Sequence, residues 1–207
     1  MTLISVAVCV RNGVDWIDGC MESLVQQSHS PLEIILVDDG STDGSEEKVK
    51  QWDTHENVTV INQKPMGLSA GRMAALQAAK GEWFAITDID VRPEADWIQR
   101  MLESSVSRED EEVVAVTGRT VFGQAKDTIS KIRSIEIESK YRSRPRITKL
   151  ANGPCSMFNR KRLLEVGGFD PSWYHAEDME VSLKLIQDGG IIVYTPNAVV
   201  NHIPETG

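Results

Sequence analysis

The sequence of 207 residues contains only three cysteines, Cys9, Cys20 and Cys155, and no two of them form a Cys-x-x-Cys pair. This number and spacing exclude a disulfide framework and a zinc site, and they are typical of thiols in a reducing compartment. No apolar run approaches the ~18 residues needed to span a bilayer. The N-terminus lacks the basic region and cleavage site of a signal peptide, so we interpret residues 3–10 as a strand. We therefore predict a cytoplasmic protein.

Positive charge is also scarce, since 22 basic residues stand against 31 acidic ones and the net charge is -9. A general nucleic-acid binder needs a basic face to displace the counterions of the phosphates. The charge balance therefore predicts no nucleic-acid partner. A hydrophobic content of 41% and a charged content of 26% are ordinary for a globular protein, and the length suits one domain.

Several nucleotide-binding motifs are missing. The first apolar segment is not followed by G-x-G-x-x-G, which argues against a dinucleotide-binding dehydrogenase. The G-x-x-x-x-G-K-[ST] motif of P-loop proteins does not occur. The Gly-rich loop with Arg and Lys that normally opens a sugar-1-phosphate nucleotidyltransferase is missing too.

The sequence does contain a regular alternation of apolar and amphipathic segments. Strands are predicted at 3–10, 32–38, 57–63 and 82–88, and helices at 14–27, 45–52, 68–80 and 93–105, the last opening with Pro93 in its first turn. Four successive β-α units predict an α/β fold whose mainly parallel central sheet is flanked by helices. After about residue 112 we expect a long strand at 112–122, a basic helix, a helix at 177–188 and a final strand at 190–196.

Polar clusters follow three of the predicted strands, at the sheet edge where open parallel sheets bind ligands. They are Arg11–Asn12, Asp38–Ser41 and the pair Asp88 and Asp90. On an extended backbone these paired acids project to the same side, about 7 Å apart, and would repel each other without a cation or donors between them. Such oxygen ligands suit Mg²⁺ or Mn²⁺ bridging to a substrate phosphate. The alternatives are that the pair caps the helix at Pro93 and that "DDGS" is only a tight turn.

The blocks "VAVCVRNG", "LEIILVDDGSTDGS", "GLSAGRMAAL", "ITDID", "NGPCSMFNR", "GGFD" and "AEDMEVSLKL" occur in this order. From about residue 3 to residue 202 the sequence resembles the family 2 glycosyltransferases of GT-A fold. The resemblance implies one GT-A catalytic domain over 1–207, with a nucleotide-binding half at 1–110 and an acceptor-binding half at 111–207. Because "NHIPETG" stops without a clear ending, we expect the catalytic part of a longer protein.

The implied activity is a metal-dependent, inverting transfer of a sugar from a nucleoside-diphosphate sugar to an acceptor hydroxyl. The implied nucleotide-sugar contacts are Val10, Arg11, Asn12, Asp38, Asp39, Gly67, Arg72 and Asp88. Among these, Asp39 would bind the base, Arg72 would lie near the base and diphosphate, and Asp88 would contact the ribose. Gly71 and Met73 stand where the family often has Ala and Asn. A plain surface arginine is the alternative for Arg72.

The resemblance also implies a metal site and a catalytic base. Asp90, together with Asp88 and with His202 after the last strand, would hold Mn²⁺ or Mg²⁺, although an isolated histidine is more often a surface or core residue. Asp178 would be the general base, at a helix N-terminus whose dipole keeps a carboxylate ionised. N-terminal capping is the alternative for Asp178.

The remaining expectations concern the acceptor. Gly153 and Glu177 are implied acceptor contacts, and an apolar stripe of Met179, Leu183 and Ile186 is predicted to pack the helix on the core. The donor is expected to be a UDP-sugar, with a GDP-sugar left open, and the acceptor a glycan or a lipid-linked molecule. Without the Gln-x-x-Arg-Trp motif of processive synthases, we expect transfer of single sugars. A nucleotide-sugar binder without transferase activity and a sugar-1-phosphate nucleotidyltransferase remain alternatives.

The segment 119–149 is basic, with nine basic residues against three acids. Ile129, Ile132, Ile135 and Tyr141 fall near one face of its predicted helix. Such a helix could rest on an anionic membrane surface at the cytoplasmic face or hold a lipid phosphate. The alternative is a solvated helix with one stripe that faces the core.

Overall fold

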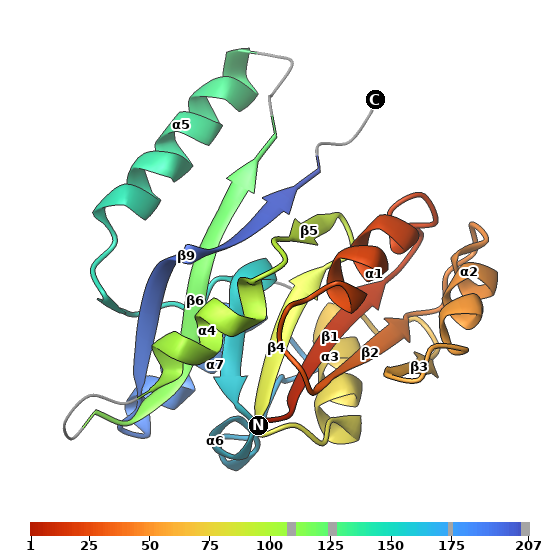
Figure 1. Ribbon diagram of the computed structural model, residues 1–207, viewed down its shortest axis with the longest axis horizontal. Coiled ribbons are helices and arrows are strands. Elements are labelled where there is room, and N and C mark those ends of the chain that lie inside the picture. Colours follow the sequence, from red (N-terminus) through yellow and green to blue (C-terminus); the bar gives the residue numbers. More distant parts are fainter. Residues whose placement is uncertain (107–110, 124–127, 174–175, 204–207) are drawn as a thin grey trace.

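The protein folds around one twisted sheet with helices on both faces, as the computed structural model in Figure 1 shows. The structure describes residues 1–106, 111–123, 128–173 and 176–203, except for the side chains of 128–134. Among the helices it describes, none combines the length and the apolar character that crossing a membrane requires.

Four parallel strands form the first half of the sheet. They are β1 (Ile4–Val10), β2 (Leu32–Asp38), β3 (Val58–Asn62) and β4 (Trp83–Asp88), in the order β3-β2-β1-β4. β-branched and other apolar residues dominate these segments, which suits strands that are covered on both faces. The four predicted strands and their parallel pairing are confirmed.

The second half of the sheet is mixed. It contains β6 (Val113–Phe122), β8 (Ser156–Asn159) and β9 (Ile191–His202), with the short strands β5 (Val91–Pro93) and β7 (Ile147–Thr148). β8 lies antiparallel between β4 and β6, β6 and β9 are parallel, and β5 and β7 both run antiparallel to β9. The prediction of a mainly parallel sheet therefore holds for the half that the β-α units form.

Helices cover the two faces of the sheet. On one face lie α1 (Ile17–Val25), α2 (Ser45–Trp52) and α4 (Trp97–Ser105), and on the other α3 (Leu68–Ala78), α6 (Arg160–Glu165) and α7 (Glu177–Gln187). The 3₁₀ turn η1 (Gly153–Cys155) precedes β8, and α5 (Thr128–Ser143) lies beside β6 at the far end of the sheet from β3 (Figure 1).

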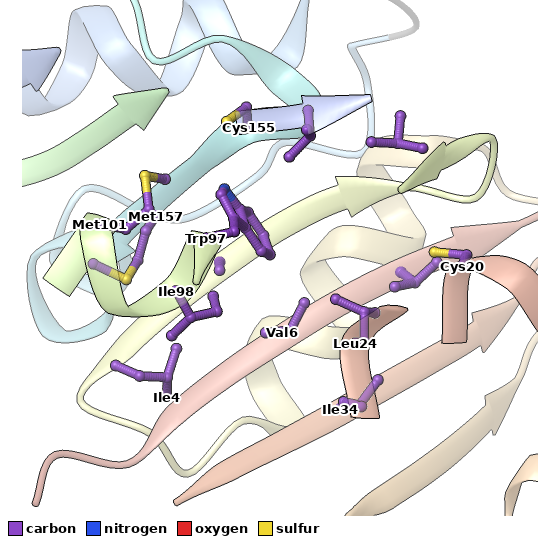
Figure 2. Close-up of a cluster of buried hydrophobic side chains, with 14 of the residues drawn as sticks. Ile4, Val6, Cys20, Leu24, Ile34, Trp97, Ile98, Met101, Cys155 and Met157 are labelled. Carbon is purple, nitrogen blue, oxygen red and sulfur yellow. The ribbon is translucent and has the colours of Figure 1, made fainter. Parts of the chain in front are cut away.

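The larger apolar core lies under α1 and α4, as Figure 2 shows. Ile4 and Val6 project from β1 to this face, while Ala7 projects to the other, as the alternation along a strand requires. Trp97 of α4 is fully buried against them. Burial of each large side chain stabilises the fold by about 1.5–3 kcal/mol, so the strands that carry the polar clusters are held rigidly.

Two predicted boundaries are wrong. Pro93 is the last residue of β5, where it pairs with Val200, and α4 begins only at Trp97. A proline is tolerated there because β5 lies at the edge of the sheet and needs hydrogen bonds on one side only. Asp88 and Asp90 therefore do not cap a helix. The last strand also runs on to His202, because its final residues continue to pair with β6.

The apolar stripe predicted for α7 is confirmed for Ile186, which packs against the core, but it is wrong for the other two residues. Met179 and Leu183 are 49% and 50% exposed, whereas Val181, Ser182 and Leu185 face the core. Buried Ser182 is satisfied there, since its hydroxyl donates to the Asp178 carbonyl at 2.6 Å and accepts from the Ala151 N–H at 3.0 Å.

The stripe predicted for α5 is only partly described. Tyr141 is buried but Ile135 is 67% exposed. The side chains of Ile129 and Ile132 lie outside the described part.

Candidate active site

The register of the strands brings the polar clusters together at one edge of the sheet. Val10 pairs with Asp38 across β1 and β2, and Cys9 pairs with Asp88 across β1 and β4. The carboxyl ends of three neighbouring strands therefore meet, as the sequence predicted. This edge is the usual ligand-binding position of an open parallel sheet.

The loop that follows β1 is tied to the loop that follows β2. Asn12 accepts a 2.8 Å hydrogen bond from the Thr42 N–H and donates its own N–H to the Ser41 hydroxyl at 3.0 Å. Its φ of 54° is left-handed, a conformation that asparagine tolerates better than most residues. The segment Arg11–Asn12 is therefore fixed against "DDGSTDGS".

Asp38 and Asp39 have different tasks, although both are buried. Asp38 accepts hydrogen bonds from the hydroxyl and the N–H of Ser41, so the turn interpretation applies to it. Asp39 reaches the loop between β3 and α3, where it accepts from the Gln63 amide at 2.6 Å and from the N–H groups of Met66 and Gly67.

Two glycines shape the same corner. Gly40 has a φ of 69°, and a Cβ there would lie 2.5 Å from Pro65 Cδ, so only glycine fits. Gly67 has a φ of 94° with open space around it, so it is required for its backbone conformation alone. That conformation aims its N–H at Asp39.

A cleft of about 390 Å³ opens beside these residues. It is lined by the predicted Val10, Arg11, Asp39 and Gly67 and also by Cys9, Met66, Leu68, Pro171, Ser172 and Trp173. Sequence reasoning missed Met66 and Trp173. The signal for Trp173 was an aromatic residue in the polar stretch just after "GGFD", and its side chain is 45% exposed. Burial raises the pKa of the Cys9 thiol to about 12, so the thiol is protonated at the cleft wall.

Arg72 of α3 connects the end of β4 to the start of α7. Its side chain is 3% exposed and bonds to the Asp88 carboxylate at 2.9 Å and to the Glu177 carboxylate. The surface-arginine alternative is therefore wrong. Glu177 is only 6% exposed, which favours a role in holding Arg72 over the direct acceptor contact predicted from the sequence. Removing one member of such a buried pair leaves an uncompensated charge and is strongly destabilising.

The pKa of Asp88 reflects competing neighbours. Burial raises the pKa of this carboxyl and the charge of Asp90 adds to the increase, while Arg72 opposes both. A cation at this position would favour the ionised form, so the pair of acids is suited to one.

Asp90 lies against His202 although the two are far apart in sequence. The antiparallel pairing of Val91 with His202 brings them together, and the Ile203 N–H donates to the Asp90 carbonyl at 2.8 Å. Asp90 Oδ2 is 3.1 Å from His202 Nε2. Partial burial acts to raise the pKa of Asp90, but the hydrogen bond and the charge of His202 hold it below the usual value.

The donor atoms of Asp90 and His202 fit a divalent ion. Two adjacent ligands of an octahedral Mg²⁺ or similar ion, each about 2.1 Å from it, lie about 3 Å apart, which matches the 3.1 Å between these atoms. Within the described residues no group of three His, Cys, Asp or Glu side chains is gathered around one such point. Among the described residues, Asp90 and His202 are thus two candidate ligands, and so few protein ligands are usual where substrate phosphates complete the coordination.

Asp178 sits in the first turn of α7 and contacts η1. Its Oδ2 accepts the Gly153 N–H at 2.9 Å, and its Oδ1 accepts the Met179 N–H at 2.8 Å. The second bond is made to an N–H of the first turn, but the N-cap of α7 is Ala176, so Asp178 is not the capping residue; the first bond lies outside the helix. A Cβ on Gly153 would lie 3.5 Å from Asp178 Oδ2 and 3.9 Å from Arg72 Nη2, so the bare Cα of this glycine faces both side chains.

The sequence model of the family described as "Glycosyl transferase family 2" matches residues 5–167 of this chain. The chain therefore belongs to this family, and the predicted GT-A fold is confirmed. The structure superposes on the mannosyltransferase PcManGT of Pyrobaculum calidifontis, solved in complex with GDP-Man and Mn²⁺, with a TM-score of 0.76 and 26% identity. That match covers 99% of this chain and 58% of the other.

Two relatives show the same kinship in sequence. The EpsH protein of Bacillus subtilis is 37% identical over 103 residues, which are 49% of this chain and 30% of EpsH. The cholesterol galactosyltransferase of Borreliella burgdorferi is 35% identical over 97 residues, which are 46% of this chain and 27% of that protein. The matches thus span less than a third of either relative.

Proposed function

We propose that this chain is the catalytic domain of a metal-dependent, inverting glycosyltransferase that uses a nucleoside-diphosphate sugar. The observation that carries the proposal is the cluster at the sheet edge, in which Asp178 and the Arg72–Asp88 pair meet at Gly153. In this proposal residues 1–110 bind the nucleotide and residues 111–207 bind the acceptor.

The donor is proposed to occupy the cleft beside Asp39. A carboxylate has about four lone-pair sites, and Asp39 uses three of them for hydrogen bonds within the chain, so one remains for an N–H of a base. The half-exposed Trp173 offers a flat apolar wall on the same cleft. The GDP-Man in the PcManGT structure supports a nucleoside-diphosphate sugar, and both UDP- and GDP-sugars belong in a test.

The diphosphate is proposed to lie over Arg72, Asp88 and Asp90. Asp90 and His202 would hold Mn²⁺ or Mg²⁺, with Asp88 beside them, and the Mn²⁺ of PcManGT supports this proposal. The ion would supply positive charge against the leaving nucleoside diphosphate. Arg72, whose charge Glu177 and Asp88 neutralise, would hold these two carboxylates in position beside the ion.

Asp178 is proposed to remove the proton from the acceptor hydroxyl. Its carboxylate lies at the N-terminal end of α7, where the helix dipole favours the ionised state that a general base needs. The deprotonated oxygen would attack the anomeric carbon from the face opposite the leaving diphosphate, so one base implies inversion. The proposed acceptor, a glycan or a lipid-linked molecule, would approach past Gly153.

The deciding experiment measures release of UDP and GDP from a panel of their sugars, with and without Mn²⁺ and with glycan or lipid-linked acceptors. NMR of the product then reports the anomeric configuration. Donor binding with no release under any condition would leave only a nucleotide-sugar binder. Release of pyrophosphate from a nucleoside triphosphate and a sugar 1-phosphate would indicate a nucleotidyltransferase instead.

A further inference from the structure

A second cleft, of about 330 Å³, lies where the end of α5 meets β6 and β9. Its lining includes four arginines and two tyrosines: Arg119, Arg142, Arg144, Arg146, Tyr141 and Tyr194. None of the described residues that line it also lines the cleft beside Asp39, so the two are separate places. We call it the arginine cleft.

Two of the four arginines are already neutralised. Arg142 pairs with Glu138 at 2.7 Å, and Arg146 forms two bonds to Glu111, at 2.9 and 2.7 Å. Arg119 and Arg144 form no ion pair with any residue that the structure describes. Within the part of the chain that the structure describes, the charges of Arg119 and Arg144 are therefore not compensated by an acid.

Buried donors in the arginine cleft also lack partners. Arg119 Nε, Arg144 Nη1 and Tyr194 Oη are buried, and none has a hydrogen-bond partner in the described part of the chain. Buried polar atoms are normally bonded, so each exception needs an explanation. The three atoms come from three elements, namely β6, the end of α5 and β9, yet they belong to one cleft.

One of these arginines, Arg144, is held in place before any ligand arrives. The guanidinium of Arg144 lies 5.1 Å from the ring centre of Tyr141 and 5.3 Å from that of Tyr194. Tyr141 is itself fixed, because its hydroxyl accepts the Asn152 amide at 2.7 Å. Stacking on rings fixes the plane of an arginine and leaves its edge available for an anion.

We propose that the arginine cleft binds a phosphate group, at a position separate from the donor diphosphate. Arginine edges match phosphate oxygens in pairs, and a tyrosine hydroxyl adds a third donor. The cleft is larger than a phosphate ion needs, so the phosphate belongs to a larger molecule, either a lipid headgroup or a soluble phosphorylated compound. The proposal does not depend on the proposed transferase activity.

A simpler interpretation is that Arg144 only fastens the end of α5 to the sheet by stacking on two tyrosines. This interpretation does not explain why Arg119 Nε and the Tyr194 hydroxyl are buried without a partner in the described part of the chain. It also predicts that phosphate does not bind. The two interpretations can therefore be separated by binding alone.

The test titrates inorganic phosphate into the protein in the presence of a chelator, which removes metal from the donor site. The ¹⁵N–¹H signals of the arginine Nε groups are followed by NMR, and Arg119→Gln identifies the Arg119 signal. We expect that signal to shift in a saturable way, and affinity to fall about tenfold or more in Arg119→Gln and in Arg144→Gln. Arg100→Gln on α4 removes the same charge elsewhere and should bind normally.

A second arm uses vesicles of phosphatidylcholine with and without phosphatidic acid. Binding to the phosphatidic acid vesicles that is lost in Arg119→Gln would assign the phosphate to a lipid, whereas response to free phosphate alone would assign it to a soluble molecule. If the Arg119 signal responds to neither probe, the proposal is overturned. It is equally overturned if Arg119→Gln, folded as judged by its spectrum, binds both probes like the unaltered chain.

Discussion

The backbone N–H of Gly153 donates a 2.9 Å hydrogen bond to Asp178 Oδ2. This bond holds the carboxylate of α7 against the turn that precedes β8 and so presents the acid to the sheet edge. It also uses one lone pair and leaves others for an acceptor hydroxyl.

Asp178→Asn can keep the Gly153 hydrogen bond through its single amide oxygen, but it loses the bond from the Met179 N–H together with the basic oxygen. We expect turnover to fall by roughly 10²–10⁴-fold, the usual size of a general-base contribution, while nucleotide affinity stays nearly unchanged. Steady-state kinetics and calorimetry with the nucleoside diphosphate measure the two quantities. Asp53→Asn, an exposed acid at the end of α2, is the matched control. Near-normal turnover would remove Asp178 from the mechanism, and loss of folding would favour a structural role.

Asp90→Asn and His202→Ala should each weaken metal-dependent binding of the donor. The two side chains supply the pair of donor atoms 3.1 Å apart, and loss of either should reduce affinity at least about tenfold. Calorimetric titration of UDP and GDP, first with Mn²⁺ and then with chelator, measures the effect. His55→Ala, on an exposed histidine that stacks on Trp52, is the control. Equal affinity with Mn²⁺ and with chelator in the unaltered chain would show that no metal is used.

Gly40→Ala should unfold more easily than Gly189→Ala, although both glycines have a positive φ. Each change places an L-residue in the left-handed region, at a cost of about 1–2 kcal/mol. Only at Gly40 does the new Cβ also overlap Pro65, which adds about 1–3 kcal/mol. Urea unfolding curves give both free energies of unfolding. If both variants lose the same free energy of unfolding, the loop that contains Pro65 moves away from the new Cβ at no energetic cost.

Asp18 should stabilise the packing of α1 against α2 in a pH-dependent way. Its pKa is lowered first by the hydrogen bond from Lys48, at 2.7 Å, and then by the bond from the Trp52 ring N–H, at 3.1 Å. A lowered pKa means that the contribution is complete above the unfolded value, about 3.9, and is lost as the pH falls through the folded value. Because the Asp18 side chain is 47% exposed, the effect should be at most about 1 kcal/mol.

Thermal unfolding of Asp18→Asn and of the unaltered chain, measured from pH 7 to acid, checks this prediction. The difference in Tm should be largest near pH 7 and should shrink in acid. Asp53→Asn corrects for the loss of one charge. A difference that stays constant into acid would show that the Asp18 contacts do not depend on its charge.

Sequence patterns predicted the parallel half of the sheet well because its signals are local. An apolar strand followed by an amphipathic helix repeats there, and the polar residues that follow each apolar run mark the end of the strand. Asp38, Asp39, Asp88 and Arg11 therefore meet where the sequence placed them.

The errors occurred where remote partners decide the outcome. The sequence also left open whether Arg72 is a surface residue, because the carboxylates that neutralise it, Asp88 and Glu177, lie 16 and 105 residues away. On α7 two apolar sets compete, and the bond from Ala151 to Ser182 helps to determine which one faces inward. Pro93 likewise favoured a helix start in the sequence, but in the structure it pairs with β9 and belongs to a strand.

The insertion of β8 between β4 and β6 has a mechanical consequence. The proposed nucleotide and acceptor halves are joined by two ladders of backbone hydrogen bonds, β4 to β8 and β5 to β9. A hinge motion that separates the two halves would break both ladders and would also disrupt the packing of the buried side chains Met157 and Phe158. The strands on both sides of this boundary should therefore behave as one rigid plate, and binding of the proposed substrates should leave their relative positions unchanged.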